Sequence, residues 1–271
     1  MYLCDTHTHS RISPDCTAAL EETAAAAVRF GLSDFYVTDH CDLLDGNGQP
    51  NTSFDWPAAK AQFHSVGAGL NGSMGFHLGI ELGSAPFDPE TARRILREGG
   101  DELDFVLGSL HNWIGLHGNI DFFISDFSAS MELCREMVDC YMEHTWTLVT
   151  ECADCYDSLA HIVYPFRYIR RDGQHLPVIN YEDQIRRILT EVARTDHALE
   201  VNTCRGTDMA YWSLLLNWFK DCGGRLVTVG TDAHEAADVG KTIPLALELV
   251  KAAGFSHAAT YEKRRPVLHK L

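Results

Sequence analysis

Histidine and acidic side chains recur where short apolar segments of this sequence end. His7 and His9 follow the first such segment, and Asp232 and His234 follow the last. Side chains two residues apart in an extended chain point to the same side, so each pair can present two ligand atoms together. Imidazole and carboxylate groups are the ligands that Zn²⁺, Mn²⁺ and Fe²⁺ prefer, so the pattern predicts a metal site. Each of the four apolar segments between them ends at a single histidine or acidic residue: His40, Glu81, His111 and His161.

Eight such groups exceed what one tetrahedral or octahedral ion can use, so we expect two or three divalent transition metal ions. A glutamate such as Glu81 is suited to bridge a pair of them. Asp15 could supply a further oxygen ligand, or it could be only an acid near the start of a helix. We expect Asp5 to orient one of the first two histidines, and Asp42 is a candidate for proton transfer. The other eight histidines are expected to be solvated or to support the ligands.

The apolar segments alternate with amphipathic ones, which indicates a parallel sheet with connecting helices. If that sheet closes into a barrel, its functional loops lie at the carboxyl ends of the strands. Residues 112–127 form a polar and aromatic insert, 164–180 are expected to be a loop, and Thr17 is a plausible helix N-cap. The expected strands are 2–4, 35–38, 76–82, 105–110, 159–163, 198–201 and 226–229, and the expected helices are 17–30, 57–70, 89–98, 128–149, 181–195, 212–220 and 239–253.

Composition limits the classes of protein that this chain can represent. It has 271 residues, 45% of them apolar, without a repeat or linker, so we expect one α/β domain over residues 1–271. The net charge of −16 repels phosphate backbones and disfavours nucleic-acid partners. No apolar run reaches 18 residues, no apolar signal region precedes Asp5, and the nine cysteines are irregularly spread. We therefore expect a cytoplasmic protein that does not enter membranes.

Six motifs together resemble those of the PHP (polymerase and histidinol phosphatase) family, in the family's order and over nearly the whole chain. The resemblance implies a distorted (β/α)7 barrel with a trinuclear metal centre. It assigns His7, His9, Glu81 and Asp232 to one metal, Glu81, His111 and His161 to a second, and Asp15, His40 and His234 to the third. The motifs are Asp5-Thr6-His7-Thr8-His9, Thr38-Asp39-His40, Gly79-Ile80-Glu81, Gly108-Ser109-Leu110-His111, Ala160-His161 and Gly230-Thr231-Asp232-Ala233-His234.

Two further stretches resemble the histidinol-phosphate phosphatase branch of that family. Residues 200–203 followed by Arg205 look like the branch's segment that ends in a phosphate-contacting arginine, and Arg167-Tyr168 looks like its Arg-Tyr pair. The chain departs from the branch at Val163, where an acid is common, and at Trp212, where a proline is common. The insert 112–127 matches nothing in the branch.

These residues together predict the hydrolysis of a small phosphomonoester, with L-histidinol phosphate as the expected substrate. Metal ions acidify a bridging water and bind phosphoryl oxygens, while Arg167 and Arg205 clamp the remaining oxygens and Tyr168 lies beside them. The residues expected to act in catalysis are Glu81, Asp232, His234 and Asp42.

Alternative functions remain open at this point. Another member of the PHP family could act on a different phosphomonoester or a nucleotide, or as an exonuclease. A metal amidohydrolase also begins with His-x-His, although it usually needs a bridging lysine at strand four. A non-catalytic metal-binding or regulatory module is the alternative of another class.

Overall fold

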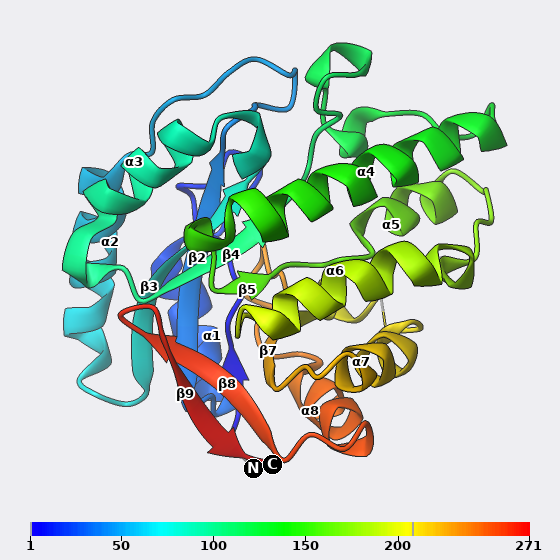
Figure 1. The fold of residues 1–271 in the computed structure, drawn as a ribbon. Coiled ribbons are helices and arrows are strands. Elements are labelled where there is room, and N and C mark those ends of the chain that lie inside the picture. Colours follow the sequence, from blue (N-terminus) through cyan, green and yellow to red (C-terminus); the bar gives the residue numbers. More distant parts are fainter. Residues whose placement is uncertain (1, 208) are drawn as a thin grey trace.

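Seven parallel strands form the centre of the computed structural model, which describes residues 2–207 and 209–271 (Figure 1). They follow one another in chain order around the sheet. Backbone hydrogen bonds from Thr6 N to Val229 O (3.0 Å) and from Asp232 N to His7 O (2.8 Å) join the first strand to the last. The expected (β/α)7 barrel is thereby confirmed. The strands are β1 (Cys4–Asp5), β2 (Asp34–Asp42), β3 (Gly75–Gly83), β4 (Phe105–Ser109), β5 (Ser158–Leu159), β6 (Ala198–Asn202) and β7 (Leu226–Gly230).

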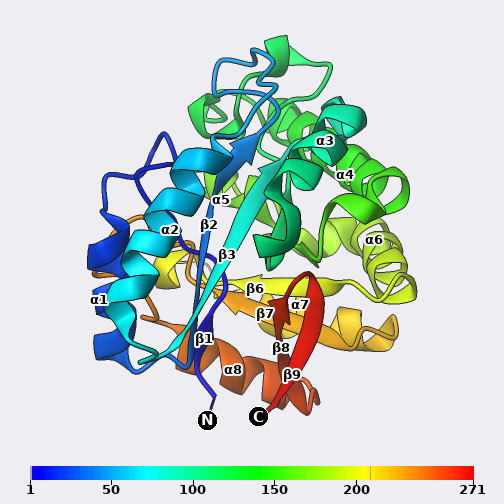
Figure 2. The same cartoon turned by 90° about the vertical axis from the view of Figure 1, so that its left-hand side faces the viewer.

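Helices surround the barrel (Figures 1 and 2), and their apolar side chains are part of the buried core. The expected periodicity holds in the helix before β6, where Ile185, Ile188, Leu189 and Val192 are all buried. The helices are α1 (Leu20–Phe30), α2 (Trp56–Leu70), α3 (Pro89–Gly99), α4 (Met131–Glu151), α5 (Tyr164–Arg171), α6 (Glu182–Arg194), α7 (Trp212–Asp221) and α8 (Ile243–Ala252). Among the described residues, no helix is both long enough and apolar enough to cross a membrane.

Four predictions about local structure were wrong. The second strand runs on to Asp42 instead of ending at Thr38, so His40 lies within it rather than after it. The stretch 164–180 is not all loop, because α5 occupies its first eight residues; Pro165 lies in the first turn, where a helix loses no hydrogen bond to proline. The fifth strand is only Ser158–Leu159, so His161 lies just beyond it. Helix α1 begins at Leu20 rather than near Thr17, and its N-cap is Ala19.

An antiparallel hairpin of β8 (His257–Glu262) and β9 (Arg265–Lys270) was not expected from the sequence. It lies near both termini, at the end of the barrel where the strands begin (Figure 2). Tyr261 is buried there against Phe105, with ring centroids 5.0 Å apart. The hydroxyl of Tyr36 donates to the carbonyl oxygen of Tyr261 at 2.6 Å. The hairpin therefore closes one end of the barrel and leaves the carboxyl ends of the strands accessible.

His77 lies near that closed end, at the beginning of β3. Its Nε2 lies 3.2 Å from Oδ1 of Asp34 and its Nδ1 lies 3.4 Å from Oδ2 of Asp104. Its ring also stacks on Tyr36 with centroids 4.4 Å apart. The expectation that His77 is solvated or supports the metal ligands was wrong. Burial lowers the pKa of His77, but the two carboxylates outweigh it and raise that pKa to about 9.

Candidate metal centre

Glu81 lies at the centre of the cluster, near the carboxyl end of β3, and is almost fully buried. Its Oε1 lies 2.7 Å from Nε2 of His161 and 3.1 Å from Nε2 of His111. Its Oε2 lies 3.0 Å from Nδ1 of His40 and 3.2 Å from Nε2 of His7. Nε2 of His9 lies 3.6 Å from the same Oε2. One carboxylate therefore faces five imidazoles from four different strands, the position that a bridging ligand requires.

The segments that follow β1 and β7 present a second group of ligand atoms. Thr8 pairs with Ala233 in a parallel bridge, so the residues on either side of each point the same way. Oδ1 of Asp232 lies 3.4 Å from Nε2 of His9 and 3.7 Å from Nε2 of His7. These three side chains lie close enough together to hold one metal ion.

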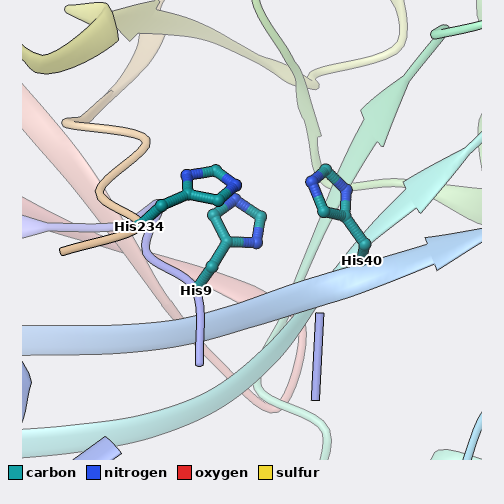
Figure 3. Close-up of side chains that lie close together, drawn as sticks. All are labelled: His9, His40 and His234. Atoms are coloured by element: carbon teal, nitrogen blue, oxygen red, sulfur yellow. The ribbon is translucent and has the colours of Figure 1, made fainter. Parts of the chain in front are cut away.

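A third group lies nearer to solvent. Figure 3 shows the rings of His9, His40 and His234 close together, although they come from three separate segments. The ring centroid of His9 is 4.3 Å from that of His40 and 4.2 Å from that of His234. Oδ2 of Asp15 lies 3.1 Å from Nε2 of His234 and 3.6 Å from Nε2 of His40. Asp15 therefore joins this group, with a side chain that is 57% exposed.

The buried polar atoms of the cluster fit metal ions better than they fit one another. Within the described part of the chain, Nε2 of His7, Nε2 of His9, Nδ1 of His40 and Oε2 of Glu81 are buried and make no hydrogen bond. Leaving such atoms unsatisfied is costly, and natural proteins rarely do so. Three overlapping groups of side chains can each hold an ion. The centre is therefore built to bind metal.

Groups behind the histidines fix the orientation of their rings. Oε1 of Glu200 lies 2.6 Å from Nδ1 of His7, and its Oε2 accepts the backbone N–H of His161 at 2.9 Å. Oδ1 of Asp42 lies 2.7 Å from Nδ1 of His111. A carboxylate only accepts hydrogen bonds, so in each pair Nδ1 carries the proton and the lone pair of Nε2 is left for a metal.

The expectation that Asp5 orients a histidine ring was wrong. Its carboxylate accepts the backbone N–H of Thr231 at 2.9 Å, the hydroxyl of Thr231 at 2.6 Å and the backbone N–H of Gly240 at 3.0 Å. Its contact with His7 is to the backbone N–H, at 3.4 Å. Asp5 thus ties β1 to the segment after β7, and burial raises its pKa to about 6.

The pKa values of Glu81 and His9 move in the directions that suit metal ligands, whereas the carboxylates around His7, His40 and His111 outweigh burial and raise the pKa values of those three rings. Burial alone would raise the pKa of Glu81, but the imidazoles of His7 and His40 hold it well below its ordinary range. Burial lowers the pKa of His9 to about 3, helped by His40 and His234. Glu81 is therefore ionised and His9 neutral near pH 7, the forms that bind a cation.

A cavity of about 920 Å³ opens above the cluster and is lined by the three residues predicted to bind substrate. Arg167 is largely buried and donates from Nη2 to Oδ1 of Asn202 at 2.7 Å and from Nη1 to Oδ2 of Asp232 at 3.3 Å. Arg205 is exposed at the rim, and Tyr168 lines the same cavity. The structure thus places all the predicted site residues in or beneath one cavity.

Sequence reasoning missed the role of Glu200 and placed no ligand-supporting group on the sixth strand. The signal was present, because Glu200 is the only acid in the apolar run of β6, Ala198–Asn202. A fully buried carboxylate needs partners, and its partners here are His7, His161 and Asn202. Tyr164 and Asp121 were also missed; both line the cavity, and their positions depend on α5 and on the insert.

A closed parallel barrel that gathers imidazoles and carboxylates at the carboxyl ends of its strands defines a metal-binding (β/α) barrel protein. The sequence matches the PHP domain family over residues 5–204, most of the chain. The chain belongs to that family, and the resemblance that its motifs indicated is confirmed.

Relatives with similar sequences or structures cover nearly the whole chain. The histidinol-phosphatase of Lactococcus lactis subsp. lactis is 26% identical over 95% of this chain and 93% of its own. A probable histidinol-phosphatase of Thermotoga maritima is 25% identical over 97% of both chains. The crystal structure of the Lactococcus lactis histidinol phosphate phosphatase, complexed with zinc, L-histidinol and phosphate, superposes with a TM-score of 0.78. That pair is 25% identical, and the match covers 98% of each chain.

Proposed function

We propose that this protein is a metal-dependent phosphomonoester hydrolase that converts L-histidinol phosphate and water into L-histidinol and phosphate. The observation that carries this proposal is the position of Arg167, whose Nη1 lies 3.3 Å from Oδ2 of Asp232 in the metal cluster. A guanidinium so close to the metal ligands can donate two parallel hydrogen bonds to phosphoryl oxygens. The relatives named histidinol-phosphatase support this choice of substrate.

We further propose two or three divalent ions, with zinc favoured by the zinc complex of the Lactococcus lactis enzyme and manganese or iron as alternatives. Bound ions would supply Lewis acidity, which neutralises phosphoryl oxygens and makes water acidic enough to attack at neutral pH. The proposed ligand groups follow the family resemblance: His7, His9, Glu81 and Asp232; Glu81, His111 and His161; and Asp15, His40 and His234. Distances between ligand atoms alone would also place His40 with Glu81 and His111.

The contacts of the other site residues suggest a role for each of them. Asn202 holds the guanidinium of Arg167 at 2.7 Å, so that this group is oriented before the substrate arrives. Arg205, at the rim, binds an outer phosphate oxygen, and Tyr168 lies beside Arg167 on α5. Asp42 acts through His111, whose Nε2 it keeps directed toward Glu81. Glu81, Asp232 and His234 act by holding the ions.

The residues that line the cavity disfavour the amidohydrolase alternative. Among the described residues no lysine lines the cavity, and the carboxylate at the bridging position is Glu81 on β3. The cytoplasmic location and the absence of nucleic-acid partners stay predictions.

A panel of phosphomonoesters tests the proposal. Metal-depleted protein resupplied with Zn²⁺, Mn²⁺ or Fe²⁺ should hydrolyse L-histidinol phosphate with a higher kcat/KM than glycerol 3-phosphate or nucleoside 5′-monophosphates. Glu81→Gln should abolish turnover, whereas Glu248→Gln, at an exposed position on α8, should not change it. A higher kcat/KM for another ester would reassign the substrate, and no hydrolysis of any ester would refute the phosphatase.

A further inference from the structure

The insert, residues 112–127, lies at the open end of the barrel (Figure 1). Its residues Asp121, Phe123 and Ile124 line the cavity. Asn112 and Asp121 pair in an antiparallel bridge, and the backbone N–H of Phe122 donates to His111 O at 2.8 Å. Asp121 N donates to Gly46 O at 3.1 Å, which joins the insert to the loop after β2. Phe122 itself is fully buried. The insert is therefore anchored directly beside the metal ligand His111.

Next to that anchor, two large apolar side chains of the insert are not packed into the core. Phe123 is 60% exposed and Ile124 is 52% exposed, and both line the cavity. The ring of Phe123 meets that of Tyr168 edge to face, with centroids 5.9 Å apart. Exposed apolar groups at the rim of a cavity are typical of ligand-binding surfaces.

Asp121 adds a carboxylate to the lining of the same cavity. Its Oδ1 accepts the backbone N–H of Phe123 at 2.6 Å, and among the described residues no Lys or Arg forms an ion pair with it. Its charge acts on the hydroxyls of Tyr164 and Tyr168, whose pKa values are raised by burial above all. Asp121 thus faces the cavity with one oxygen that the fold does not use.

The nearby cation cannot serve as the partner of Asp121. Arg171 also lines the cavity, but it is bound at 2.6 Å to Oδ1 of Asp172 and at 2.6 Å to the carbonyl oxygen of Ser125. The other cavity arginines, Arg167 and Arg205, belong to the elements after β5 and β6. The guanidinium of Arg171 lies 5.8 Å from the ring centroid of Phe123 and donates to the carbonyl oxygen of that residue, so the wall carries this cation beside the ring and the carboxylate of Asp121.

We propose that the insert selects the organic part of the substrate, with Asp121 binding a protonated nitrogen and Phe123 packing against the carbon skeleton or ring that carries it. A carboxylate that gains a cationic partner in a sheltered cavity forms a charge-assisted hydrogen bond. The exposed ring of Phe123 offers apolar surface to the carbon skeleton that carries the nitrogen. The inference rests on the proposed phosphatase activity, and it names the class of ester that this chain prefers: one with a cationic organic group.

Two pairs of esters test this preference. L-histidinol phosphate and O-phosphoethanolamine carry a positive charge on the organic group, whereas p-nitrophenyl phosphate and glycerol 3-phosphate do not. The quantity measured is the ratio of kcat/KM for the charged ester to that for the uncharged one, in the parent and in Asp121→Asn. The matched control is Asp126→Asn, an exposed carboxylate of the same insert that does not line the cavity.

In Asp121→Asn the ratio should fall about 10- to 100-fold, the loss typical of a charged hydrogen bond. Asparagine can still accept the N–H of Phe123, so the insert keeps its anchor, and Asp126→Asn should keep the parent ratio. An equal loss on charged and uncharged esters, or no loss at all, would overturn the inference.

The two proposals can fail separately. Suppose that the parent does not hydrolyse L-histidinol phosphate but prefers O-phosphoethanolamine, and that Asp121→Asn loses this preference. The role of Asp121 in binding a cationic group is then supported, and the proposed substrate is wrong. If L-histidinol phosphate is the preferred ester and Asp121→Asn keeps the parent ratio, the substrate stands and the role of Asp121 is refuted.

Discussion

His7 and Glu200 form a fully buried pair across the barrel, in which Nδ1 of His7 lies 2.6 Å from Oε1 of Glu200. Gly230 makes this approach possible, since a Cβ there would lie 2.4 Å from Cβ of His7 and 2.8 Å from Oε1 of Glu200. The pair fixes the tautomer of His7 and directs Nε2 toward Glu81 and Asp232. The sixth strand therefore supports the metal centre without supplying a ligand to it.

Glu200→Gln should weaken metal binding about 10- to 100-fold, as is typical when a group that orients a ligating histidine is lost. Glutamine keeps the size of the side chain but offers one acceptor oxygen for the two contacts to His7 and His161. Competition with a chelator of known affinity measures the effect, and Glu248→Gln on the surface serves as the control. Unchanged metal affinity would mean that Glu200 serves only the fold.

Glu81→Gln should reduce the bound metal more than Asp15→Asn does. Glu81 faces five imidazoles and is buried, whereas Asp15 faces two and is 57% exposed. A carboxylate between two ions neutralises both, so its loss affects the pair together. Elemental analysis of the two variants measures this, and equal losses would refute the bridging assignment.

Arg205→Ala should leave the metal content unchanged but lower kcat/KM for phosphomonoesters. Losing a buried charged contact costs about 2–5 kcal/mol, and because Arg205 is exposed we expect the lower end, about 30-fold. Arg205→Lys should recover only part of the loss, since an ammonium cannot make the two-pronged contact. Parent-like turnover by the alanine variant would identify Arg205 as an ordinary surface residue.

His77 should make stability depend on pH at the closed end of the barrel. Its pKa rises from 6.5 to about 9 on folding, because Asp34 and Asp104 outweigh its burial. The stabilisation is then complete below about pH 6.5 and is lost as the pH rises through 9; it amounts to on the order of 3 kcal/mol.

Chemical denaturation of the parent and of His77→Gln at pH 6 and pH 10 measures this effect. The difference in unfolding free energy between the two proteins should be large at pH 6 and should shrink at pH 10. A difference independent of pH would contradict the ion-pair account of His77.

The sequence predicted the parallel sheet and the placement of the candidate ligands because both depend on local patterns, whereas the closed (β/α)7 barrel was implied by the resemblance to the PHP family. Short apolar strands give period-two spacing, which is why His7 and His9 emerge on one side of the chain. Ligands at the ends of parallel strands must then converge at one end of the barrel. Glu81 could be singled out in this way, because an acid at the end of a buried strand needs cationic partners.

The supporting contacts could not be predicted, because they join residues far apart in the chain. The partner of His7 is Glu200, 193 residues away. Asp5 was assigned to a histidine ring on proximity in sequence, whereas its carboxylate reaches Thr231 and Gly240 across the closure between β1 and β7. Helix α5 was missed because residues 164–180 were expected to be a loop, whereas Pro165 lies in the first turn of a helix, where proline costs no hydrogen bond. Packing between distant segments decides such contacts, and local pattern does not encode it.

The most direct test of the proposed metal-dependent phosphatase activity measures the bound metal and the turnover in the same samples. Protein stripped with a chelator is titrated with Zn²⁺, and at each step the bound zinc and the phosphate released from L-histidinol phosphate are measured. We expect no turnover without metal, and activity that rises until two to three equivalents are bound. Full turnover by metal-free protein, or saturation with less than one equivalent bound, would contradict the account.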